Sequence, residues 1–177
     1  MKRAIVLLMV VLFMGTGCGP GGKWEPFESD EGWFAAEFPG RPRKEKMPTP
    51  SPLGTIDIHM YSVTLNKGAY AVGYFDFPAA DQVDMESGSF IESMARGSYT
   101  NIGTGNFTKK TIDFEGYPGL ETEGEVRKGS LSGVARIRYY VVQGRVFLLQ
   151  VLGERSFVSS GNTAKFFGSF RLLYNED

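Results

Sequence analysis

The reactive side chains of this sequence include one thiol, Cys18, and one imidazole, His59. A single thiol excludes a disulfide within the chain, and a zinc site could draw on only one histidine. Any Ser-His-Asp system would have to use His59. The sequence contains no metalloprotease, nucleotide-binding or nucleophile-elbow motif. We therefore expect no catalytic residue, no metal and no cofactor.

His59 lies in residues 55–65, where side chains alternate as they do in a half-buried strand. Asp57, His59 and Tyr61 share one face of this predicted strand, and Ile56, Ile58 and Met60 share the other. An aspartate and a tyrosine beside a histidine could form a polar site, and a hydrolase built around His59 and Asp57 stays open as an alternative. We favour a histidine on the surface of a strand.

The residues before Cys18 have three parts: a positive start at Lys2 and Arg3, an uninterrupted apolar run from Ala4 to Met14, and the small residues 15–17. This order is typical of a secretory signal, and the run is shorter than the roughly 20 residues of a transmembrane helix. A small-residue cleavage site directly before a cysteine resembles the bacterial lipoprotein signal. That resemblance implies a diacylglycerol on Cys18. An ordinary secreted protein and an uncleaved anchor are the alternatives.

The lipoprotein reading divides the chain into a signal peptide (1–17), a lipidated cysteine with a short flexible tether (18–23) and one globular domain (24–177). Its lipid would hold the domain on a membrane of the bacterial cell envelope, on the periplasmic side. Gly19 follows the cysteine where enteric lipoproteins of the inner membrane carry aspartate. The resemblance therefore allows an outer-membrane location.

The charge of the chain is nearly balanced, with 19 basic and 20 acidic side chains. Such a balance gives no electrostatic footprint for nucleic acid. One local basic cluster, Arg41, Arg43, Lys44 and Lys46, lies among prolines, which favours an edge strand or a loop. A membrane-facing or partner-facing patch is the functional alternative to a charged, solvated edge.

Aromatic residues make up 14% of the chain and glycines number 23, which favours sheet and turns over a helical bundle. We expect an α+β domain, an antiparallel sheet covered by helices. The predicted strands are 32–38, 55–65, 69–77, 109–115, 120–127, 133–142 and 145–152, the last as a central strand. The predicted helices are 81–96, ended by Gly97, and 163–173, capped by Ser160 or Asn162.

Turns are predicted at 116–119 and at Gln143-Gly144. We expect Arg136 and Arg138 to lie opposite or diagonal to Glu121 and Glu123.

Several of these features together resemble the PsbP-like fold, a group that includes the bacterial lipoprotein DcrB. They are Phe38-Pro39 closing the first strand, Tyr117 to Gly119 before a strand, the hairpin from Arg138 to Leu152, and Phe166 to Phe170 near the end. The resemblance implies an α/β/α sandwich. Its members are accessory or binding proteins rather than enzymes, and they share no universal site.

The leading hypothesis is therefore a membrane-anchored envelope lipoprotein that acts as a non-catalytic accessory or protein-binding module. It predicts a patch of exposed aromatic or charged side chains and an envelope protein as partner. The alternative is a small-molecule or lipid carrier with a cleft between sheet and helices, lined by residues such as Tyr70, Tyr74, Tyr139 and Phe147.

Overall fold

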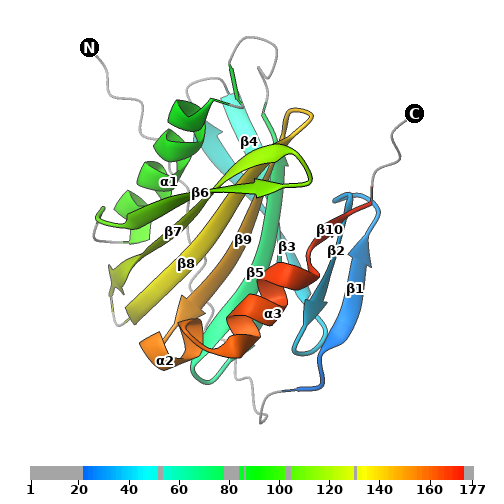
Figure 1. Cartoon of the computed structure of the whole chain (residues 1–177), viewed down its shortest axis with the longest axis vertical. Helices are drawn as coiled ribbons and strands as arrows, with labels where there is room; N and C mark the ends of the chain where they lie inside the picture. Colours follow the sequence, from blue (N-terminus) through cyan, green and yellow to red (C-terminus); the bar gives the residue numbers. More distant parts are fainter. Residues whose placement is uncertain are drawn as a thin grey trace.

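The computed structural model describes residues 22–51, 54–77, 84–85, 87–102, 105–129 and 131–173. Within these ranges, ten strands form two antiparallel sheets and three helices pack against them (Figure 1). The predicted signal peptide, Cys18 and residues 18–21 of the predicted tether lie outside the described residues. The first described strand starts at Glu25.

The larger sheet, called here the large sheet, contains seven of the described strands. Their spatial order is β3 (Arg43–Ser51), β4 (Gly54–Leu65), β5 (Gly68–Asp76), β9 (Arg145–Gly153), β8 (Leu131–Val142), β7 (Tyr117–Lys128) and β6 (Thr108–Phe114). The predicted apolar strand is central, as expected: β9 is buried along most of its length. The predicted strands 55–65 and 69–77 are β4 and β5, which pair as a hairpin, and the predicted edge position of the proline-rich strand β3 is confirmed.

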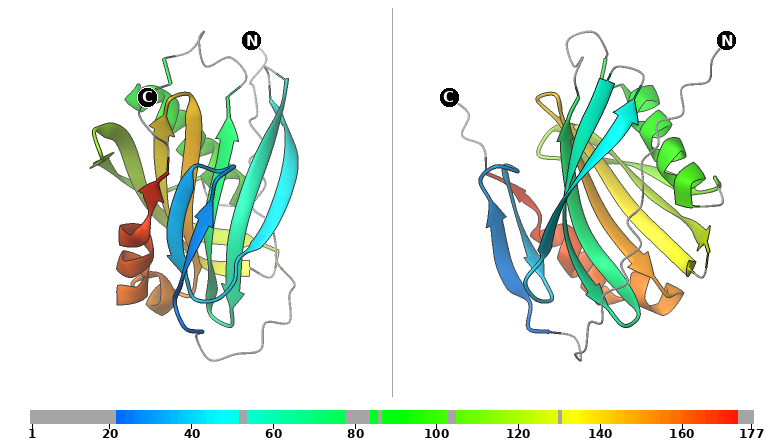
Figure 2. Two further views of the ribbon diagram at one scale, coloured as in Figure 1. Left: turned by 90° about the vertical axis from the view of Figure 1, so that its right-hand side faces the viewer. Right: turned by 180° about the vertical axis from the view of Figure 1, so that it is seen from behind.

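A second, small sheet lies beside the large one and consists of β1 (Glu25–Ser29), β2 (Phe34–Phe38) and β10 (Arg171–Leu172). The helices are α1 (Gly88–Ile102), α2 (Arg155–Val158) and α3 (Gly161–Ser169). Figure 2 shows the small sheet and α3 on one side of the large sheet and α1 on the other.

The large sheet buries both of its faces, in two separate hydrophobic clusters. One cluster joins β2 and α3 to the tyrosines and valines of β4, β5, β8 and β9. The other joins Ile91, Ala95 and Tyr99 of α1 to the opposite side chains of the same sheet. The expectation of a sheet covered by helices was therefore overstated. The fold is mainly antiparallel sheet, and the small sheet, together with two short helices, covers one face.

Two tight turns fix the register of the hairpins in the second half of the chain. Glu115-Gly116 and Gln143-Gly144 both have positive φ at each residue, between 50° and 87°. This backbone is that of the two-residue hairpin turn whose twist matches the flanking strands. The turn at Gln143-Gly144 was predicted. The wider turn predicted at 116–119 is wrong, because Tyr117 already pairs with Phe114.

The first predicted helix was placed too early in the chain. Asp84 and Met85 are not helical, residues 81–83 and 86 lie outside the described part, and α1 begins at Gly88. Ser87 accepts hydrogen bonds from the Phe90 amide through its hydroxyl (3.3 Å) and its carbonyl (3.0 Å), which begins the helix. The helix then runs through Gly97, because continuing it buries Tyr99 and Ile102.

The last predicted helix is too long. α3 ends at Ser169, and Arg171–Leu172 leave it as β10 to pair with β2. Sequence reasoning missed α2. Ser160 precedes α3, as predicted, but its hydroxyl donates to the Phe157 carbonyl (2.7 Å) and makes no capping bond.

Candidate binding surface

Two large hydrophobic side chains are exposed among the described residues, Trp33 and Leu173, each at 37% of its full surface. They come from distant parts of the sequence. The backbone amide of Leu173 donates a 2.9 Å hydrogen bond to the carbonyl of Trp33. The two residues are therefore neighbours at the turn between β1 and β2, and the surface that they define is called here the Trp33 surface.

The turn that carries Trp33 is tied to the core beneath it. The Ser29 hydroxyl accepts the Gly32 amide (3.0 Å) and donates to the Tyr61 hydroxyl (3.1 Å). A side chain at Gly32 would lie 2.7 Å from the Phe34 ring and 2.8 Å from that hydroxyl. Trp33 has a φ of 57°. For a residue with a side chain, this left-handed conformation costs about 1–2 kcal/mol.

Arg145 supports the inner face of Trp33. Its guanidinium lies 3.9 Å from the Trp33 ring and 4.8 Å from the Tyr74 ring, so it is sandwiched between two aromatic side chains. Two of its nitrogens donate to the two carboxylate oxygens of Asp76, at 2.7 and 2.9 Å, and a third donates to the Glu31 carbonyl at 2.9 Å. These contacts hold the strained turn in place and leave the outer face of Trp33 open.

Further polar groups lie beside the Tyr74 ring, and two of them, Glu31 and Lys44, are exposed. The His59 ring stacks on Tyr74 at 4.8 Å, nearly parallel. Its Nδ1 lies 3.4 Å from Glu31 Oε1, and the same carboxylate accepts a hydrogen bond from Lys44. The Lys44 ammonium lowers the pKa of the Glu31 carboxyl, and burial raises the pKa of Tyr74. The chain thus places the only imidazole in a stacked, mostly covered position.

The structure does not bring His59 and Asp57 together as a catalytic pair. They share a face, as predicted, but Asp57 pairs with Lys46 at 2.9 Å whereas His59 contacts Glu31. The described residues contain no group of three or more metal-ligating side chains.

The four aromatic residues predicted to line one cleft are packed in the cores. Tyr70, Tyr74 and Phe147 lie on the small-sheet side of the large sheet, and Tyr139 lies on the α1 side. Each is at most 2% exposed. They cannot line a common cleft, because the sheet separates Tyr139 from the other three.

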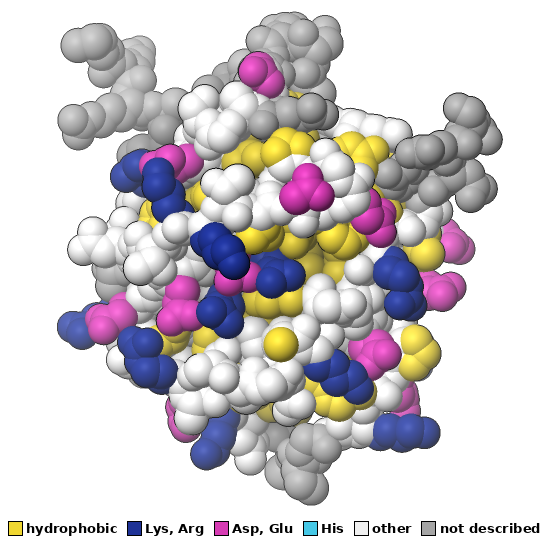
Figure 3. All heavy atoms as spheres, viewed as in Figure 1, with side chains coloured by type: hydrophobic (Ala, Val, Ile, Leu, Met, Phe, Trp, Pro, Cys, Tyr) yellow, Lys and Arg dark blue, Asp and Glu magenta, His cyan; other side chains and the backbone are white. Residues whose placement is uncertain are grey.

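The charged side chains of β3 and of the β7–β8 hairpin have structural partners. In β3, Arg43, Lys44 and Lys46 each contact a carboxylate. Glu121 pairs with Arg138 and Glu123 with Arg136 in the register, as predicted. Figure 3 shows a mixture of basic and acidic side chains on the face of the molecule that carries β7 and β8.

Sequence reasoning missed Trp33, Leu173 and Arg145 as members of one surface. The predicted strand 32–38 included Trp33, and the predicted helix 163–173 included Leu173. The sequence did indicate the position of Arg145 within its strand. This residue directly follows the two-residue turn at Gln143-Gly144, so it is the first residue of the next strand. Nothing in the sequence placed it opposite Asp76 and under Trp33.

Comparison with solved structures identifies the fold. The solution structure of cyanobacterial PsbP (CyanoP) from Synechocystis sp. PCC 6803 matches with a TM-score of 0.57 and 11% identity, over 91% of this chain and 98% of that one. A crystal structure from Bacteroides thetaiotaomicron VPI-5482 matches with a TM-score of 0.52 and 8% identity, over 89% of this chain and 51% of that one. No family model and no curated protein matches the sequence.

The domain therefore has the PsbP-like fold that its sequence features resemble. At 11% identity the likeness concerns the fold, and function has to be argued from the site. Among the described residues, no helix is long and apolar enough to cross a bilayer.

Proposed function

We propose that this protein is a lipid-anchored, non-catalytic binding module of the bacterial cell envelope, and that the Trp33 surface docks on a protein partner. The observation that carries the proposal is the exposed tryptophan held in a strained conformation over a buried arginine. Backbone strain of this kind persists at functional sites, and tryptophan is among the residues that contribute most to protein interfaces.

The direction of the β1–β2 hairpin supports the same proposal. β1 starts at Glu25, a few residues after Cys18, and Trp33 lies at the other end of the hairpin (Figures 1 and 2). A five-residue strand spans about 17 Å. A lipid on Cys18 would hold the starting end near the membrane, and the Trp33 surface would face away from it.

The anchor is tested by replacing Cys18 with Ala. We expect wild-type cells to incorporate labelled palmitate into the protein, and globomycin to block removal of the signal peptide. The Cys18→Ala protein should carry no label, because the acylated thiol is gone. Equal labelling of the variant and the wild type would exclude lipidation at Cys18.

Docking is tested by capture from the solubilised envelope with the Trp33→Gly protein. Glycine removes the Trp33 ring and its contact with the Arg145 guanidinium, which destabilises the turn. Glycine also relieves the backbone strain at this position, which offsets that loss, so the fold should be kept. We expect the wild type to retain a stoichiometric partner and Trp33→Gly to lose it. Arg127→Ala, an exposed residue away from the Trp33 surface, is the control. The same partner yield from all three proteins would contradict docking through Trp33.

A further inference from the structure

β6 is an edge strand of the large sheet and differs from the other described edges. Prolines interrupt two of those edges, Pro26 in β1 and both Pro48 and Pro50 in β3, and β10 is only two residues long. Proline, short length and charged side chains, lysine above all, are devices by which proteins prevent an edge from pairing with another strand. β6 has the sequence TKKTIDF, which carries two lysines but no proline over its seven residues.

The turn at Glu115-Gly116 determines which backbone amides and carbonyls of β6 form no hydrogen bond to β7. A two-residue turn makes Phe114 and Tyr117 the hydrogen-bonded pair that closes the hairpin. Bonding alternates along an antiparallel pair, so residues 112, 110 and 108 also bond to β7. The amides and carbonyls of Lys109, Thr111 and Asp113 therefore point outward from the edge.

A cavity lies beside this edge on the α1 side of the sheet. Its volume is about 270 Å³, and its lining includes Ile91 of α1, Thr111 of β6, and Pro118 and Leu120 of β7. Glu92 and Lys109, joined at 2.5 Å, close one wall. Side chains of an added strand would alternate between this cavity and the other face of the sheet.

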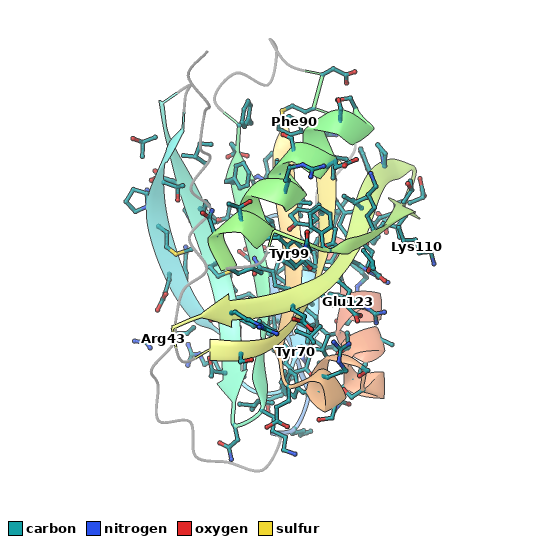
Figure 4. All side chains as sticks on the ribbon, turned by 90° about the vertical axis from the view of Figure 1, so that its left-hand side faces the viewer. Arg43, Tyr70, Phe90, Tyr99, Lys110 and Glu123 are labelled. Atoms are coloured by element: carbon teal, nitrogen blue, oxygen red, sulfur yellow. The ribbon has the colours of Figure 1, made fainter. Side chains whose placement is uncertain are left out.

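The other face of β6 presents an unpaired positive charge. Lys110 is exposed, points away from the sheet in Figure 4, and forms no ion pair with the other described residues. Its neighbour Lys109 is already paired with Glu92. An acidic side chain on an added strand would complement Lys110.

We propose that β6 binds an extended segment of a partner protein as an added antiparallel strand, with an apolar residue opposite Thr111 directed into the cavity and an acidic residue opposite Lys110. This mode of binding combines backbone hydrogen bonds for affinity with alternate side-chain contacts for specificity. It goes beyond the proposed docking through Trp33, because it uses a different surface and needs neither Trp33 nor the anchor.

The probe is a blocked, fluorescein-labelled heptapeptide, Thr-Lys-Val-Ile-Glu-Thr-Thr, which places isoleucine opposite Thr111 and glutamate opposite Lys110. Its affinity for the full chain in detergent is measured by fluorescence anisotropy. Thr111→Pro removes an outward amide while leaving the bonds to β7, and should weaken binding by about tenfold. Thr111→Ala keeps the amide and should bind as the wild type does. Trp33→Gly should also bind normally, so this test is independent of docking through Trp33.

Peptide methylation tests the wild-type chain without altering its fold. N-methylation of the isoleucine, whose amide would face Thr111, should abolish binding. N-methylation of the glutamate, whose amide would point away from β6, should not. Failure of the wild type to bind the probe, or equal loss from both methylations, would overturn the proposal. A dimer of the chain that Thr111→Pro dissociates would also overturn it, and would assign the edge to a second copy.

Discussion

Arg145 links parts of the chain that are far apart in sequence. It extends from the start of the central strand β9, pairs with Asp76 of the neighbouring strand β5, and donates to the Glu31 carbonyl in the turn between β1 and β2. Its side chain is only 9% exposed, and three of its nitrogens have partners. The arginine thus connects the large sheet to the turn that carries Trp33.

Replacing Arg145 with Lys should destabilise the protein although the charge is kept. An ammonium cannot form the two-point contact with Asp76, reach the Glu31 carbonyl and stack flat between two rings. We expect the free energy of unfolding to fall by about 1–3 kcal/mol in urea denaturation. Arg127→Lys, at an exposed position, should change it by less than about 0.5 kcal/mol. Equal effects of the two substitutions would show that the geometry around Arg145 is unimportant.

At the scale of single residues, the sequence was informative where the type of a side chain alone determines which chemistry is available. One thiol and one imidazole limited the chemistry before any fold was known. The Trp33 surface could not be predicted, because Arg145 and Asp76 are 69 residues apart and Leu173 is farther still from Trp33. Long-range contacts of this kind depend on strand order, which side-chain alternation does not specify.

At the scale of elements, strands were easier to predict than helix ends. Alternation identified both faces of β4, and a run apolar on both faces identified β9 as central. The prediction of the first helix relied on glycine as a stop signal, and that signal failed at Gly97. Glycine in a helix costs only about 1 kcal/mol relative to alanine. Burial of the Tyr99 and Ile102 side chains stabilises the longer helix by more than this cost.

Two glycines give a matched test of the elements around α2 and α3. Gly168 lies inside α3, and an added Cβ would meet no atom within 4 Å. Gly168→Ala should therefore raise the free energy of unfolding by about 0.5–1 kcal/mol. At Gly68, the first residue of β5, a Cβ would lie 2.5 Å from the Phe157 ring and against the Leu152 carbonyl.

Gly68→Ala should therefore lower the melting temperature, whereas Gly168→Ala raises it. Calorimetry of both proteins beside the wild type measures the difference. If Gly168→Ala were destabilising, α3 would not be the regular helix described here. If Gly68→Ala were neutral, the close packing of α2 on the β4–β5 turn would be wrong.

The whole molecule buries several tyrosine hydroxyls in its two cores. Burial raises the pKa of Tyr99 to about 12 and raises the pKa of Tyr74 and Tyr139 as well. An unfolded tyrosine titrates near pH 10. The folded state therefore binds these protons more tightly, and their contribution to stability is complete below about pH 10 and is lost as pH rises above it.

We therefore expect cooperative alkaline unfolding between about pH 10 and 12, with tyrosinate absorbance rising together with the loss of near-ultraviolet circular dichroism. Exposed tyrosines would instead ionise near pH 10 with the fold intact. Stepwise ionisation of all the tyrosines before any loss of the dichroism signal would contradict the packing of both cores.

The central claim, that the Trp33 surface docks on a partner, is tested most directly by photocross-linking in intact cells. A photoreactive residue is placed at Leu173, whose backbone bonds to Trp33, and at Arg127 as the control. We predict one discrete protein adduct from position 173, absent from position 127 and lost when Trp33→Gly is added. The same adducts from both positions, or an adduct at 173 that survives Trp33→Gly, would contradict the claim.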